Sequence, residues 1–392
     1  MNNDMKDLIK IFERIPDERQ SGKIKHLLCD VIFIAIIATV ASCDDYEEIE
    51  EYATENEEWF RKYLQLPNGI PSHDTIERVF SWINPKLLTS CFADWTSLIS
   101  KSSIPIKVET EEGTSKQQGI IAIDGKTMRA TGSSEKKAMH VVSAWFSEDK
   151  MVLGQVQTSE KSNEITAIPE LLKILDITGN IVTIDAMGTQ TKIANEIVAK
   201  KADYVLAVKT NHVSLHTPIV EFFNELDKRL IEEYKISHFH QTEKGHGRIE
   251  TRDFYITDQI KWLEPNTKWA KLTSIGMVVY KSEKNGKANT EVRYFIASIP
   301  ANAELFAKAV RSHWGVESMH WLLDLTFNED RRRNRIDNSA INLASLLRLS
   351  LNILRTAENP RKRPIKKLRK TCYKHIYMID DMITKALRAK QD

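Results

Sequence analysis

Two short apolar runs, each ended by an aspartate, constrain this sequence more than any other feature. The stretch GIIAIDGKT, residues 119–127, ends its β-branched run at Asp124, directly before a glycine. The same order recurs in NIVTIDAMG, residues 180–188, where the run ends at Asp185. Short β-branched runs predict buried strands. A carboxylate at the end of a buried strand is costly unless it is paired. The sequence therefore predicts either two caps of the following turns or two ligands of a shared metal site.

The rest of the chain predicts a mixed α/β protein with a helical domain in front of it. The 392 residues are 42% hydrophobic and 28% charged, which suits two or three globular domains. Helical spacing predicts an all-helical N-terminal domain at residues 1–105. The polar stretch from Glu109 to Gln118 is expected to be a linker. Alternating strands and helices predict a mixed-sheet domain at residues 115–335, with a β-rich insertion at about 212–300. A basic helical segment, 336–392, ends the chain.

Several element boundaries are also predicted. The apolar run from Val31 to Ala41 belongs to a buried helix and is too short to span a bilayer. One acidic amphipathic helix is expected from Tyr46 to Leu64, and a last helix from about His375 to Ala389. The strands expected in the insertion are Arg248–Ile256, Leu272–Lys281 and Glu291–Ile299.

The charges are unevenly distributed along the chain. The formal net charge is +2, but from Arg331 onward 17 Lys and Arg face only 5 Asp and Glu. Acidic residues outnumber basic ones before Phe60. A basic end on a nearly neutral protein indicates a polyanionic partner, of which nucleic acid is the first candidate. The four cysteines form no C-x-x-C pair, which is typical of reduced cytoplasmic thiols. No signal peptide is visible.

The segment RSHWGVESMHWLLDLTFNED, residues 311–330, predicts a helix with polar side chains on one face. The residues on that face are His313, Glu317, His320 and Asp324. One interpretation is a solvent-facing stripe, with Trp314 and Trp321 in the core. A second is a zinc site made by the two histidines and Glu317. The third is that Glu317 completes a trio of carboxylates with the two strand-end aspartates.

A trio of carboxylates would have a specific chemistry. Oxygen ligands alone suit Mg²⁺ or Mn²⁺ better than zinc. Two such ions about 3.5–4 Å apart clamp the attacking and leaving oxygens of an in-line phosphoryl displacement. Together with the basic end of the chain, this interpretation predicts a nuclease or a strand-transfer enzyme.

The sequence resembles the DDE transposases of the ISAs type of bacterial insertion sequence, the group that includes the H-repeat-associated proteins. The resemblance covers nearly the whole chain. The segments that carry it are IAIDGKTMRAT (121–131), LGQVQTSEKSNEITAIPELL (153–172), GNIVTIDAMGTQTKIA (179–194), ADYVLAVKTN (202–211), GHGRIETR (245–252) and SHWGVESMHWLLDLTFNEDRRR (312–333). The N-terminal segments IPDERQSGKIKHLL and PSHDTIERVF resemble the helical domain associated with that family.

The resemblance implies an RNase H-like catalytic domain with Asp124, Asp185 and Glu317 as the catalytic and metal-binding residues. It implies two Mg²⁺ or Mn²⁺ ions, double-stranded DNA as element ends and target, and a homo-oligomer in the bacterial cytoplasm, at the nucleoid. The spacing agrees, because 185 − 124 = 61 residues hold three strands and a helix, and 317 − 185 = 132 residues leave room for an insertion. His313 and Asp324 stand where the wider group often has basic residues. This departure leaves open which residues bind the DNA near the cleaved bond.

Other residues are weaker candidates for contacting DNA or for supporting the metal ligands: Lys126, Arg248, Arg311, His313, His320, Arg331, Arg332 and Arg333. Two alternatives to a transposase remain open, a metal-dependent nuclease without strand transfer and a non-catalytic DNA-binding relic. We expect the N-terminal domain to act mainly in assembly. The competing interpretation is that it reads the element ends through Lys23, Lys25, Arg61, Lys62 or Arg78.

Overall fold

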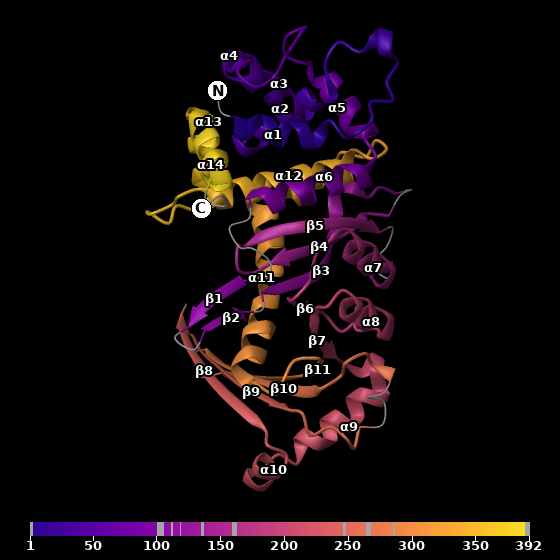
Figure 1. Cartoon of the computed structure of the whole chain (residues 1–392), viewed down its shortest axis with the longest axis vertical. Helices are drawn as coiled ribbons and strands as arrows, with labels where there is room; N and C mark the ends of the chain where they lie inside the picture. Colours follow the sequence, from indigo (N-terminus) through magenta and orange to yellow (C-terminus); the bar gives the residue numbers. More distant parts are fainter. Residues whose placement is uncertain are drawn as a thin grey trace. The chain divides into compact units, whose positions relative to one another are not determined.

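The computed structural model describes residues 3–99, 106–110, 113–117, 119–134, 137–158, 163–245, 248–263, 268–284 and 287–388. The chain forms two compact units (Figure 1). The first contains Met1–Ser103, Gly125–Asn163 and Glu317–Asp392, and the second contains Ile104–Asp124 and Glu164–Val316. The division falls inside strand β3 (Ile120–Met128) and inside helix α11 (Ala303–Phe327). The C-terminal residues therefore belong to the same unit as the N-terminal helices.

The predicted N-terminal helices are present in the first unit. They are α1 (Asn3–Phe12), α2 (Leu28–Val40), α3 (Tyr46–Glu55), α4 (Glu57–Phe60), α5 (His73–Trp82) and α6 (Pro85–Ile99). In α2 every residue except Cys29 is buried, as expected for a helix that is apolar all round. The single helix expected from Tyr46 to Leu64 is interrupted at Asn56, whose Nδ2 donates to the backbone oxygen of Tyr52 at 2.8 Å. This side chain competes with helical hydrogen bonding and separates α3 from α4.

Three C-terminal helices complete the first unit: α12 (Ser339–Thr356), α13 (Ile365–Lys374) and α14 (Tyr377–Arg388). Helix α12 lies beside α6, and both pack on strand β5 (Met151–Thr158), as Figure 1 shows. Asn352 of α12 is buried and bonds both to the backbone nitrogen (2.9 Å) and to the backbone oxygen (2.8 Å) of Val152. Helix α12 thus supplies hydrogen bonds to backbone groups of β5, a strand at the edge of the sheet. Helix α13 was not predicted, because its sequence is mostly basic and only a few of its residues are buried.

The strands form a nine-stranded mixed sheet in the order β5-β4-β3-β6-β7-β11-β10-β9-β8. The predicted hairpin is β4 (Met139–Phe146) and β5, which are antiparallel. Strands β3, β6 (Ile181–Ile184) and β7 (Asp203–Val208) are parallel neighbours. Helix α7 (Glu164–Ile174) leads from β5 into β6, and helix α8 (Thr191–Ala199) connects β6 with β7. The predicted mixed α/β fold, with antiparallel strands before parallel crossovers, is confirmed.

The predicted insertion is a continuation of this sheet. Its elements are α9 (Val213–Asn224), α10 (Lys228–Glu233), β8 (Ser237–Gly245), β9 (Arg248–Thr257), β10 (Ser274–Lys284) and β11 (Lys287–Ala297). The four strands are antiparallel, and β11 pairs with β7, where Tyr294 opposes Val208. Strand β8 was not predicted. Its residues alternate between half-buried and exposed, so its sequence lacks the apolar face that marks a strand.

The linker predicted from Glu109 to Gln118 is wrong. Strands β1 (Ile106–Thr110) and β2 (Gly113–Gln117) form an antiparallel hairpin there. Polar side chains on both strands concealed it from an argument based on hydrophobic pattern. All four cysteines lie in the described regions as free thiols, three of them buried. Among the helices of the described residues, none is long and apolar enough to cross a membrane.

Candidate active site

Asp124 and Asp185 occupy matched positions on two neighbouring strands of the second unit. Ile123 of β3 stands opposite Ile184 of β6 in a parallel pair, so each aspartate follows at the next position. Neighbouring strands of a sheet lie about 4.8 Å apart, which brings the two backbones side by side at this point. Both aspartates are half-buried, although the strands before them are fully buried. The prediction that two strands each deliver one carboxylate at the same edge agrees with this register.

Asp185 shapes the turn that follows it with one of its two oxygens. Its Oδ1 accepts hydrogen bonds from the backbone nitrogens of Met187 and Gly188, each at 3.1 Å. Its Oδ2 has no hydrogen-bond partner among the described residues. Asp185 can therefore cap the turn with one oxygen and still offer the other oxygen to a ligand. From the sequence alone these two roles were alternatives.

Two further residues hold this turn close to the sheet. Asn211 donates from Nδ2 to the backbone oxygen of Ala186 at 2.8 Å. A Cβ on Gly188 would lie 2.7 Å from Cδ1 of Ile168 and closer still to Ile184, so only glycine fits there. The sequence did not predict this role of Asn211, because 25 residues separate it from Ala186 and no spacing rule joins them.

His313 is half-buried in the second unit. Its Nδ1 lies 3.0 Å from Oγ1 of Thr183, a residue of β6 just before Asp185. Burial lowers the pKa of His313 to about 4, and the negative charge of Asp185 only partly opposes that effect. His313 is therefore neutral near pH 7. Thr183 already uses its Nδ1, and a contact of His313 with DNA stays a prediction.

Glu317 begins the part of α11 that belongs to the first unit, and its side chain is exposed. Within the described part of the chain, no three His, Cys, Asp or Glu side chains stand together as a group that could hold a metal ion. The convergence of Glu317 with the two aspartates therefore stays a prediction. The zinc interpretation of this helix has no support in the contacts of its histidines.

Lys126 is part of a buried ion cluster in the first unit. Its Nζ binds Asp324 and lies 2.7 Å from Oε2 of Glu329. Glu329 is completely buried, and its other oxygen binds Arg348, which is also completely buried. The two cations lower the pKa of Glu329 to about 2 in spite of burial. Carboxylates of the same unit thus already compensate the charge of Lys126, and its expected role near DNA or near the metal ligands stays a prediction.

The positions of His320 and Trp321 contradict the interpretation of a solvent-facing polar stripe with both tryptophans in the core. His320 is buried, and burial lowers its pKa to about 3, so it is neutral near pH 7 and does not face solvent. Trp321 is 64% exposed, so the expectation that both tryptophans lie in the core is wrong for this one. Glu329 and Arg348 were not predicted as partners, because 19 residues separate them and no spacing rule joins them.

Arg311 and Arg248 are paired with carboxylates in the second unit. Arg311 donates to both oxygens of Glu243, at 2.8 and 3.1 Å, and its guanidinium lies 5.7 Å from the ring centre of Trp314. Arg248 is exposed, and its Nε lies 2.6 Å from Oε1 of Glu250. Both arginines reach the surface, but a phosphate would have to compete with a carboxylate that each already binds.

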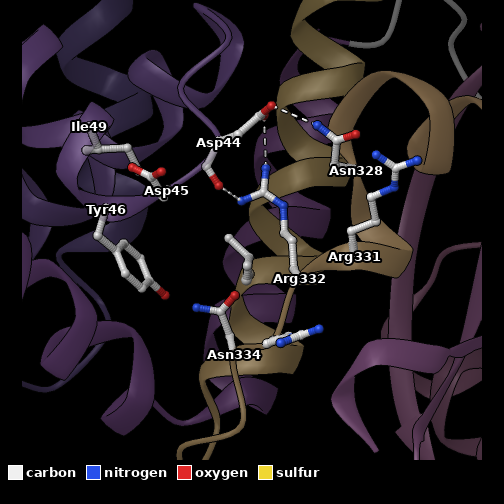
Figure 2. A pocket seen from close by; sticks show the side chains of 10 residues that line it. Asp44, Asp45, Tyr46, Ile49, Asn328, Arg331, Arg332 and Asn334 are labelled. Carbon is white, nitrogen blue, oxygen red and sulfur yellow. Dashed lines mark hydrogen bonds and ion pairs between the residues drawn. The ribbon is translucent and has the colours of Figure 1, made fainter.

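The three consecutive arginines after α11 have different surroundings, and Figure 2 labels two of them, Arg331 and Arg332. Arg332 is largely buried, and its Nη2 lies 3.1 Å from Oδ1 of Asp44. Arg369 of α13 binds the same oxygen at 3.0 Å. Arg331 and Arg333 are exposed and line the same pocket of about 380 Å³. The prediction of phosphate contacts therefore applies to Arg331 and Arg333, whereas Arg332 is held inside its own chain.

The chemistry of the two aspartates fits a divalent metal ion. Matched carboxylates on adjacent parallel strands offer the oxygen ligands that Mg²⁺ and Mn²⁺ prefer. Asp185 Oδ2 is not used by any described residue, and no lysine or arginine pairs with Asp185 in the described structure. The donor chemistry of Asp124 and Asp185 would therefore suit such an ion.

Comparison with known proteins places the chain in a family. The model described as "Transposase DDE domain" matches residues 115–353, and the one described as "DDE_Tnp_1-associated" matches residues 9–96. "Putative transposase YncI" of Escherichia coli O157:H7 is 40% identical over 94% of this chain and 93% of that protein. "H repeat-associated putative transposase YhhI" of Escherichia coli K12 is 37% identical over 90% of this chain and 91% of that protein.

One solved structure, a piggyBac transposase synaptic complex with hairpin DNA, matches 99% of this chain and 78% of that chain with a TM-score of 0.37 and 11% identity. So distant a likeness supports no conclusion about this chain. The family model covers more than half of the chain, and the two relatives cover nearly all of it. The chain belongs to the DDE transposase family.

Proposed function

We propose that this protein is an active DNA transposase that cleaves phosphodiester bonds at the ends of an insertion sequence and transfers the freed strands into target DNA. The observation that carries the proposal is the register of β3 and β6, which puts Asp124 and Asp185 at matched positions. Family membership supports the same chemistry. Glu317 is proposed as the third carboxylate of the site.

The strand order supports an RNase H-like core for the catalytic domain. Antiparallel β4 and β5 lie on one side of β3, and parallel β6 and β7 lie on the other. The two aspartates stand at the centre of this arrangement. Mg²⁺ or Mn²⁺, bound as two ions, would polarise the phosphodiester and activate the attacking oxygen. Asp124, Asp185 and Glu317 would position the ions, and Asn211 and Gly188 would keep the Asp185 turn in place.

The partners that follow from this proposal are double-stranded DNA, as element ends and as target, and further copies of the same chain. Activity at a bacterial nucleoid agrees with the relatives from Escherichia coli. A nuclease without strand transfer and a non-catalytic relic are the competing functions.

A strand-transfer assay distinguishes these functions. The full chain would be incubated with intact and with pre-cleaved element ends and a supercoiled target plasmid, with Mg²⁺, with Mn²⁺ and with EDTA. A transposase joins pre-cleaved ends to the plasmid in either metal and not in EDTA. Cleavage of intact ends without joining would indicate a nuclease, and DNA binding without either reaction would indicate a relic.

A further inference from the structure

The N-terminal helical domain, for which the matching family model names no activity, contains a groove. Its volume is about 830 Å³. One side is the segment around η1 (Ser21–Lys23), and the other side is a face of α5. The residues that the α5 side contributes are Ser72, Thr75, Arg78, Val79, Ser81 and Trp82. All of the residues that line this groove belong to the first unit.

Three cations of this groove have no carboxylate partner in the described structure. Lys23 and Lys25 are exposed and form no ion pair there. Arg78 is exposed too, and it donates only to the backbone oxygen of Asp74 (3.2 Å) and to Thr75 Oγ1 (3.5 Å). A fourth cation, Arg19, is neutralised by Asp17 at 2.5 Å. Three positive charges are thus free to attract an anion.

The acids of the groove do not cancel these charges. Glu50 accepts from both the backbone nitrogen and Nδ1 of His73, at 2.7 and 2.6 Å, so its charge is already shared with another group. Glu18 is exposed and is the one remaining acid of the groove lining. Three free cations against the two carboxylates of Glu18 and Glu50 still leave the groove positive, although the first sixty residues are acidic overall.

The groove also offers neutral polar groups and an apolar surface. Nδ1 of His26 is buried without a hydrogen-bond partner in the described structure. The hydroxyls of Ser72 and Thr75 lie 3.2 Å apart on the α5 side, and Trp82 is 37% exposed. Lysine, arginine and hydroxyl groups are the side chains that contact phosphate and sugar in protein–DNA complexes.

We propose that this groove binds the phosphodiester backbone of a DNA duplex, so that the associated domain holds DNA while the catalytic domain acts. The inference deepens the proposed function and rests on it, because it takes DNA as the polyanion. The structure also divides the five basic residues of this domain that the sequence offered as candidates for reading the element ends into two groups. Arg61 is paired with Glu57 at 2.5 Å, and Lys62 lies over the ring of Tyr377 at 4.9 Å. Lys23, Lys25 and Arg78 line the groove.

The test compares two triple variants of the full chain. The groove variant carries Lys23→Gln, Lys25→Gln and Arg78→Gln, and the control carries Arg61→Gln, Lys62→Gln and Lys86→Gln, which removes the same charge from the same domain. The probe is a fluorescein-labelled duplex of random sequence, titrated at several salt concentrations. Each lost phosphate contact reduces the log–log salt slope by about 0.9, so the groove variant should lose about two to three units. The control should lose less than about one.

An unchanged slope for the groove variant, or an equal loss in the control, would overturn the inference. If instead the groove variant keeps its slope but loses self-association in the absence of DNA, the groove binds another copy and the inference is also overturned. Equal melting temperatures verify that the variants are folded. Strand transfer by the wild-type chain is measured separately. A reduced slope without any strand transfer would support DNA binding by the groove and reject the proposed function. An unchanged slope together with strand transfer would support the proposed function and reject DNA binding by the groove.

Discussion

Glu329 and Asp185 are both acids at the end of an element, and the protein treats their charges in opposite ways. Glu329 has no exposed surface, lies 2.7 Å from Lys126 and also binds Arg348. Asp185 is half-buried, and the hydrogen bonds to its side chain come from two backbone nitrogens. A buried charge is tolerated when cations and hydrogen bonds compensate it. The fold therefore neutralises Glu329 by itself, whereas Asp185 retains a charge for a partner from outside.

Removing the charge of Asp185 should cause the largest effect on activity. Asp185→Asn keeps an Oδ1 that can accept from Met187 and Gly188, so the turn and the stability should stay nearly unchanged. Loss of a metal ligand removes several kcal/mol of transition-state stabilisation, which corresponds to a rate loss of about a thousandfold. Asp124→Asn should behave likewise. Single-turnover cleavage, with thermal melting as the control for folding, measures both. Cleavage at a wild-type rate would remove these aspartates from the site.

Removing the charge of Glu329 should mainly affect stability. Glu329→Gln leaves Lys126 and Arg348 buried with less compensation, and breaking a buried ion pair costs about 3–5 kcal/mol. The matched control is Glu291→Gln, because Glu291 is exposed and its pair with Arg293 should contribute less than about 1 kcal/mol. Urea unfolding of the two variants tests the difference. Equal losses would mean that the buried cluster contributes no more than a surface pair.

The sequence predicted the strand-end aspartates and the parallel crossovers well, because local rules determine them. An apolar β-branched run and the residue after it can be recognised without knowing what they pack against. The same reasoning could not find β8 or the β1–β2 hairpin, whose strands depend on their neighbours for backbone pairing more than on an apolar face.

The roles of the basic residues were less predictable. Lys126 and Arg332 look in the sequence like the cations expected near DNA, yet carboxylates distant in the chain bind them. The partner of Lys126 lies 203 residues away and that of Arg332 lies 288 residues away. No spacing rule covers such distances. The sequence thus identified the charged residues but could not show which charges the fold itself neutralises.

Acidification should lower the free energy of unfolding through His313, a third group whose charge depends on its surroundings in the fold. Its pKa is about 4 in the fold, below the usual 6.5 of an unfolded chain, because burial disfavours the charged imidazole. Below about pH 6.5 the unfolded state binds more protons, so stability falls by roughly 1.4 kcal/mol per pH unit until about pH 4. His313→Asn, which can still bond to Thr183, should lose this part of the pH dependence.

The measurement for His313 is the free energy of unfolding at several pH values between 4 and 7. The same substitution at the exposed His375 is the control, because it measures what an exchange of histidine for asparagine does away from Thr183. A variant of His313 with the pH dependence of the wild type would show that this histidine does not remain neutral in the fold.

The smallest effects should come from the arginines after α11, where the same distinction applies to positive charges. Arg331 and Arg333 are exposed, so the double variant Arg331→Gln, Arg333→Gln should keep its stability within about 0.5 kcal/mol. Its salt slope for DNA binding should fall by about one unit per lost contact. Arg332→Gln should do the reverse, because Arg332 is largely buried and already bound to Asp44. It should lose about 1.5–3 kcal/mol of stability, as expected for hydrogen bonds to a charged group. If Arg332→Gln instead changes the salt slope and leaves the stability unaltered, pairing with Asp44 does not keep Arg332 from binding DNA. The distinction between arginines paired inside the fold and arginines available to DNA would then be wrong.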